Sequence, residues 1–81
     1  MNDRDESWTE WARRAQTGDK EAYRFLLHDI TPYIRNIIMP TLANPDWADD
    51  IIHEVLISVN KSLKKYSPES PFKPWLLAII N

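Results

Sequence analysis

Apolar residues along this chain recur at steps of three and four, which is the spacing of an amphipathic helix. The sharpest pattern covers residues 45–63, where one face is apolar and the other is polar. Asn44 can cap this helix and Pro45 suits its first position, because the first N–H groups of a helix have no internal partner. The apolar face consists of Trp47, Ile51, Ile52, Val55, Val59 and Leu63. The pattern therefore predicts a core helix with a polar outer surface.

A first helix is predicted near the N-terminus. Ser7 and Glu10 have the spacing of a capping box, in which both side chains accept hydrogen bonds from free N–H groups at the helix start. Gly18 stands where a left-handed C-terminal cap is expected. Residues 1–6 are mostly charged, and we expect them to be disordered.

Two more helices follow from the same periodicity. Asp19 can cap a second helix, whose apolar face continues past Pro32 to about Met39. We expect one helix bent at the proline, because the ring displaces a carbonyl one turn back. A last apolar helix is predicted after residue 70, with Ser70 as its cap and Pro71 at its first position.

The composition limits the class of protein. With 81 residues and no strand-like alternation, the chain predicts one all-α domain over residues 7–81, a compact bundle of three helices plus the start of a fourth. Cysteine is absent, and neither a signal peptide nor a membrane span is evident, so we expect a cytoplasmic protein. The net charge of −2 disfavours a stand-alone nucleic-acid binder, which is usually basic on one face.

No catalytic or metal site is evident in the sequence. His28 and His53 have no second ligand at a metal-binding spacing, and we interpret both as surface residues. Asp49 and Asp50 are adjacent and so diverge around a helix, where they suit the positive end of its dipole. We therefore expect no enzyme activity, no cofactor and no bound metal.

The segment from 64 to 75 combines aromatic and cationic side chains. They are Tyr66, Phe72 and Trp75 with Lys64, Lys65 and Lys73. Rings between cations suit single-stranded nucleic acid, because bases stack on the rings while phosphates meet the lysines. The alternative is a loop fixed by aromatic packing, and the residues themselves favour neither.

Several segments together resemble region two of bacterial extracytoplasmic-function (ECF) sigma factors. They are the Gly-Asp-containing segment Arg14–Tyr23, the Asp-Asp-Ile-Ile-His-Glu-Val segment Asp49–Val55, the Tyr-Ser-Pro segment 66–68 and the Pro-Phe-Lys-Pro-Trp-Leu-Leu-Ala-Ile segment 71–79. They occur in the order and spacing of the family, over roughly residues 11–80.

The resemblance implies a helical domain that binds the β′ clamp helices of core RNA polymerase and helps to open the minus-ten promoter element. The polymerase-binding residues it implies are Asp50, His53, Glu54, Ile57, Asn60 and Lys61. The loop 66–74 would hold a base flipped from the non-template strand of promoter DNA. The DNA-binding residues it implies are Tyr66, as an aromatic wall, with Ser67, Lys73 and Trp75.

Two departures from the family pattern open an alternative. His53 stands where the family usually has Gln, and the chain ends at Asn81, before the basic part of the last helix and the second DNA-binding domain. We interpret the chain as a truncated sigma factor. The alternative is a sigma-like decoy that binds an anti-sigma factor without contacting DNA. An anti-sigma partner fits both hypotheses, and the apolar last helix could also pair with itself in a dimer.

Overall fold

A computed structural model describes residues 3–80 of the chain. Its elements in chain order are α1 (Asp3–Gln16), α2 (Lys20–Ile38), the 3-10 turns η1 (Met39–Thr41) and η2 (Pro45–Trp47), α3 (Ala48–Ser62), the 3-10 turn η3 (Leu63–Lys65) and α4 (Phe72–Ile80). Within this range there is no strand, and the predicted all-α fold is confirmed.

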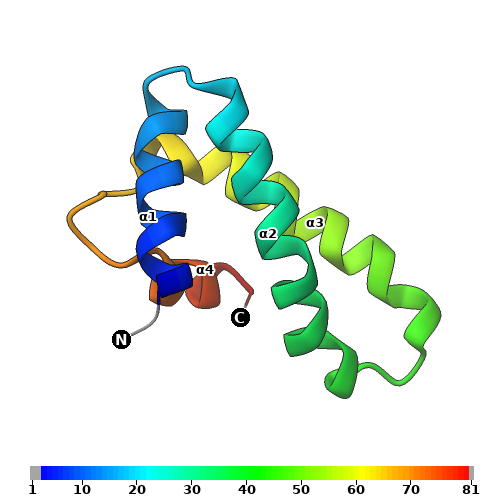
Figure 1. Cartoon of the computed structure of the whole chain (residues 1–81). Helices are drawn as coiled ribbons and strands as arrows, with labels where there is room; N and C mark the ends of the chain where they lie inside the picture. The colour runs from blue at the N-terminus through cyan, green and yellow to red at the C-terminus, as the bar shows by residue number, and fades with distance from the viewer. Residues whose placement is uncertain (1–2, 81) are drawn as a thin grey trace.

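The helices are arranged around an antiparallel hairpin of α2 and α3 (Figure 1). Helix α1 packs against α2 as far as Tyr33, and α4 lies beside the first half of α1 and against α3 (Figure 1). The far end of the hairpin, residues 39–47, extends beyond α1 and α4 (Figure 1). One side of α3 is therefore left uncovered along the hairpin.

The core is built from one stripe of each helix. Trp8 is fully buried and lies edge-on to Tyr33 and Phe72, with ring centroids 5.0 and 6.3 Å away. Its indole N–H donates to the Asp29 carboxylate at 2.6 Å, which satisfies the polar end of the ring. The aliphatic part of the core consists of Leu26, Ile30, Ile34, Ile38, Ile52, Val55, Val59, Leu63 and Leu76.

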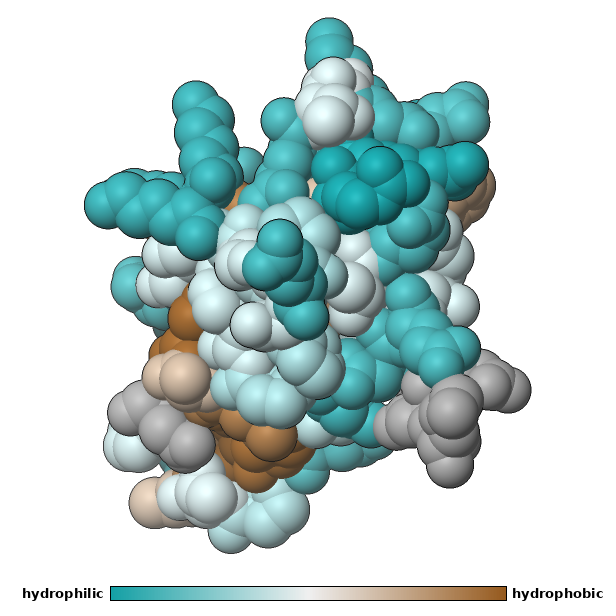
Figure 2. Space-filling model, turned by 90° about the vertical axis from the view of Figure 1, so that its left-hand side faces the viewer, coloured by the Kyte–Doolittle hydropathy of each residue, from teal (hydrophilic) through white to brown (hydrophobic). Residues whose placement is uncertain are grey.

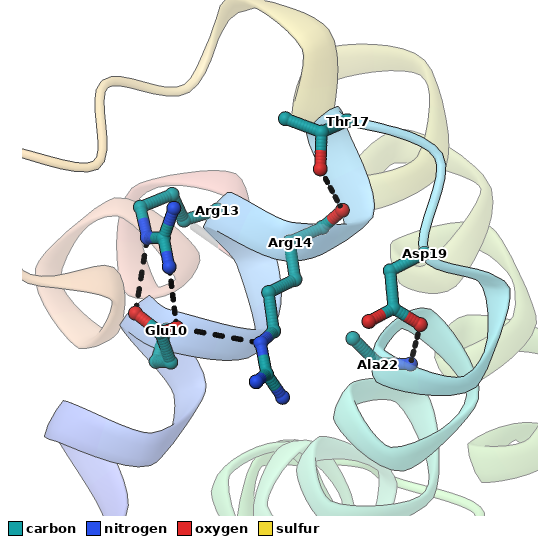
Figure 3. A network of polar contacts seen from close by, with 6 residues as sticks. All are labelled: Glu10, Arg13, Arg14, Thr17, Asp19 and Ala22. Carbon is teal, nitrogen blue, oxygen red and sulfur yellow. Dashed lines mark hydrogen bonds and ion pairs between the residues drawn. The ribbon is translucent and has the colours of Figure 1, made fainter.

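The turn between α1 and α2 forms as the sequence predicts, and Figure 3 shows its polar contacts. Gly18 has a φ of +98°, a left-handed conformation that glycine adopts without steric cost, and Asp19 accepts a hydrogen bond from the Ala22 N–H at 3.0 Å. Both predicted caps are confirmed. Within α1, Glu10 binds Arg13 at 2.5 Å, and this hydrogen bond lowers the pKa of the Glu10 carboxyl below its ordinary value.

The predicted capping box at Ser7 is wrong. Helix α1 begins at Asp3, so Ser7 lies inside the helix and residues 3–6 belong to it; residues 1–2 of the expected disordered segment lie outside the described residues. Acidic residues in the first turn suit the positive end of the helix dipole, which allows the earlier start. Glu10 pairs with arginines instead of capping the helix.

Helix α2 is a single helix that continues through Pro32 to Ile38, as predicted. Asn44 caps the next segment as expected, because its side chain accepts from the Asp46 N–H at 2.9 Å. That segment is a 3-10 turn, however, and α3 begins only at Ala48. Trp47 does not belong to the predicted apolar face: it is 52% exposed, and Ala48, four residues before Ile52, takes the core position.

The start of α4 is capped by α1. Thr9 Oγ1 accepts from the Phe72 N–H at 3.1 Å and Asp5 Oδ1 accepts from the Lys73 N–H at 2.9 Å. The predicted Ser70 cap is wrong, because α4 begins after Pro71 and the Ser70 N–H donates to the Ser67 carbonyl at 3.0 Å. A helix start needs partners for its free N–H groups, and here they come from another helix.

We predict that Thr9→Val lowers the free energy of unfolding by about 1 kcal/mol, because it keeps the side-chain shape and removes a helix-capping oxygen. Ser7→Ala removes an exposed hydroxyl from the same helix and should change stability by less than about 0.5 kcal/mol. Urea unfolding of both variants measures the difference. Equal losses would contradict the capping of α4 by α1.

Candidate functional site

The outer face of α3 carries every residue of the predicted polymerase surface. Asp50, His53, Glu54, Ile57, Asn60 and Lys61 are all exposed. They recur at helical steps of three and four on the side opposite the buried Ile52, Val55 and Val59. The structure therefore brings these residues together on one continuous strip, which we call the α3 strip; their role in binding is a prediction.

Asn60, at the edge of the α3 strip, also forms a hydrogen bond to α2. Its Oδ1 accepts a hydrogen bond from the Tyr23 hydroxyl of α2 at 2.6 Å. Burial raises the pKa of the Tyr23 phenol above its ordinary value of 10.0, so the hydroxyl keeps its proton at neutral pH and remains a donor. This bond links α3 to α2 and fixes that edge of the strip.

The charged side chains change sign along α3 and the 3-10 turns on either side of it. The first half of α3 and the turn before it carry Asp46, Asp49, Asp50 and Glu54, whereas the last part and η3 carry Lys61, Lys64 and Lys65. Asp49 is paired with Arg35 of α2 at 2.8 Å. The α3 strip is therefore acidic at its beginning and basic at its end.

Trp47 extends the α3 strip at its N-terminal end. It lies three residues before Asp50 and seven before Glu54, on the exposed side of η2. The sequence analysis placed this tryptophan in the core because it lies four residues before Ile51. The buried stripe of α3 instead runs through Ala48, Ile52, Val55 and Val59, and Ile51 at its edge is only partly buried, so Trp47 lies outside it.

Tyr66 lies in the core instead of forming a free wall of the loop. It is only 3% exposed, its ring is 5.4 Å from that of Phe72 and 5.1 Å from that of Trp75, and its hydroxyl donates to the Ser70 carbonyl. Burial raises the pKa of its phenol above the ordinary value of 10.0. A base cannot stack on this ring unless these contacts are displaced.

Lys73 is also turned toward the body of the protein. Its Nζ lies 5.1 Å from the ring centre of Tyr33 and 5.7 Å from that of Trp8, which are cation–π distances. Trp75 is partly buried, and Ser67 is exposed. Of the predicted DNA-binding residues, the structure leaves Ser67 and part of Trp75 accessible, and it places Tyr66 and Lys73 in the packing that holds the loop.

The loop between η3 and α4 is held from α1. The Gln16 amide donates to the Leu63 carbonyl at 2.8 Å and to the Tyr66 carbonyl. Between the loop and α1 lies an open hollow of about 440 Å³, and its lining includes Asp5, Glu6, Glu10, Glu69 and Ser70. Carboxylates around this hollow disfavour phosphate groups at its mouth.

The face formed by α1 and the loop is uneven in polarity. Figure 2 looks onto this side and shows a hydrophilic upper half, with hydrophobic side chains at the surface lower down, at the level of α4. Trp75, Leu77, Ile79 and Ile80 of α4 are each partly exposed. Among the described residues no three His, Cys, Asp or Glu side chains form a metal-binding group.

No described helix is long and apolar enough to cross a membrane. Residues 21–81 match the model of the sigma-70 region 2 family. No curated protein and no solved structure matches the chain significantly. Because the matched segment covers most of the chain and all of α3, the loop and α4, the chain belongs to the sigma-70 region 2 family. Membership supports a sigma-factor role in RNA polymerase binding and promoter melting.

Proposed function

We propose that this chain is the region-two domain of an ECF-type sigma factor and that its α3 strip binds the β′ clamp helices of core polymerase. The observation that carries the proposal is the strip itself. Its residues share one exposed face of a helix whose opposite face forms the core, so a partner can contact them without any change in the fold.

The chemistry of the α3 strip suits a helical partner. Ile57 is 38% exposed at the middle of the strip, with Glu54 one turn before it, Lys61 one turn after it and Asp50 two turns before it. An apolar centre with a charged rim is the usual composition of a protein interface. Charged residues at the rim mainly set orientation and association rate, whereas the apolar centre contributes affinity.

For promoter DNA we propose that some residues of the loop and α4 contact the DNA while others hold the loop in place. Lys64, Lys65 and Ser67 are exposed at its start and meet the strand, and the accessible part of Trp75 meets a base. Tyr66 and Lys73 hold the loop and the start of α4 in place. Flipping a base out of its stack costs a few kcal/mol, which contacts of this kind must offset.

We further propose that the domain has no catalytic role of its own and that it acts in the cytoplasm.

A second function is favoured by one observation. The ring of Tyr66 and the ammonium group of Lys73 are engaged inside the domain, and the nearby hollow is lined with carboxylates. These features suit a sigma-like decoy that binds an anti-sigma factor and does not contact DNA. Under either function, an anti-sigma factor that covered the α3 strip would compete with polymerase.

We predict that Glu54→Lys weakens binding to core polymerase about tenfold or more, because it places a positive charge one turn before Ile57, where the acidic part of the α3 strip is proposed to face basic side chains of the partner. Glu69→Lys makes the same charge change in the loop, on the opposite side of the molecule in Figure 1, and should leave the affinity within about twofold. Fluorescence anisotropy of the labelled chain measures both affinities, and thermal unfolding checks the fold. Equal affinity of Glu54→Lys and the unaltered chain would exclude the proposed surface.

We predict that Lys64→Gln/Lys65→Gln weakens binding of a single-stranded minus-ten oligonucleotide by the chain bound to core polymerase. Each lost phosphate contact should reduce the slope of log affinity against log salt by about 0.7. The control is Arg24→Gln, which removes an exposed charge from α2. An unchanged affinity and slope in the double variant would favour the decoy.

A further inference from the structure

Trp47 is a large apolar side chain that lies exposed at the surface and outside the core. Among the described residues the large hydrophobic side chains with high exposure are Phe25 at 54%, Trp47 at 52% and Ile57 at 38%. By contrast, Trp8 belongs to the buried core, and Trp11 and Trp75 pack against it. Tryptophan is a highly buried residue on average, so an exposed one beside a predicted interface indicates a contact site.

The turn that carries Trp47 is fixed by local bonds. The Asn44 side chain accepts from the Asp46 N–H at 2.9 Å, and the Asn44 carbonyl accepts from the Trp47 N–H at 3.1 Å. Pro45 restricts the backbone between them. The backbone that carries the ring is thus ordered, and little backbone entropy is lost when a partner covers Trp47.

Trp47 lies in line with the rest of the α3 strip. Trp47 and Ile57 are ten residues apart, which corresponds to about 15 Å along a helix. The strip thus presents two apolar side chains, with Asp50 and Glu54 between them on the same face. The acidic start and basic end of the strip then require a partner that is basic opposite Glu54 and acidic opposite Lys61.

We propose that Trp47 is a hydrophobic anchor of the contact with core RNA polymerase, seated in an apolar pocket bordered by basic side chains of the partner. This inference rests on the proposed function, because the α3 strip that Trp47 continues is the surface assigned there to polymerase. The occupant is polymerase rather than a second copy of the chain because membership of the sigma-70 region 2 family supports polymerase binding, and Trp47 adjoins the strip proposed for that contact.

The test compares the affinities of three variants for core polymerase by anisotropy of the labelled chain. Trp47→Ala should weaken binding about tenfold or more, and Trp47→Phe should weaken it less, because it keeps an aromatic ring. The matched control is Phe25→Ala, which removes an equally exposed ring from α2 and should stay within about twofold. Thermal unfolding of each variant separates loss of contact from loss of fold.

Three results would overturn the inference. If Trp47→Ala binds within twofold while Glu54→Lys binds weakly, the anchor is wrong and the α3 strip stands. If neither variant is affected, the proposed polymerase surface fails as well. If sedimentation shows that the free chain dimerises and that Trp47→Ala abolishes the dimer without changing polymerase affinity, the occupant of the Trp47 site is a second copy.

Discussion

The hydrogen bonds from α1 to the C-terminal segment are the constraint on which the rest of the structure depends. Asp5 and Thr9 accept the first N–H groups of α4, and the Gln16 amide donates to two carbonyls at the end of η3. The segment between η3 and α4 forms no helix, and within it the buried Tyr66 bonds to the Ser70 carbonyl. Without α1 the loop would lose the two bonds from Gln16, and the first N–H groups of α4 would have no protein partner.

This arrangement separates two surfaces. Because α1 and α4 use the aromatic rings around Trp8 and Phe72 to complete the core, the outer face of α3 is not needed for folding. The α3 strip is therefore free to carry charges and the exposed Trp47. The loop reaches the other side of the molecule in Figure 1, although it follows α3 directly through η3. Family membership supports binding of both RNA polymerase and promoter DNA.

Features set by neighbouring residues could be predicted from the sequence, and features set by distant ones could not. The caps at Gly18 and Asp19, and the polar face of α3, follow from local patterns and are confirmed. The capping of α4 by Thr9 joins residues 63 positions apart and leaves no local signal. Likewise the composition of the loop suggested nucleic-acid binding, but whether Tyr66 faces a base or the core depends on packing that periodicity does not describe. Trp47 was misplaced because the spacing to Ile51 does not show that the core stripe is centred on Ala48 and Ile52.

The central claim is that polymerase and promoter DNA use separate faces of the domain. Hydroxyl-radical footprinting of the chain alone, with core polymerase, and with polymerase and promoter DNA tests it most directly. We predict that polymerase alone protects Trp47, His53 and Ile57 from oxidation and leaves Trp75 unchanged. Promoter DNA should then add protection at Trp75. Protection of Trp75 by polymerase alone, with Trp47, His53 and Ile57 still reactive, would contradict the account.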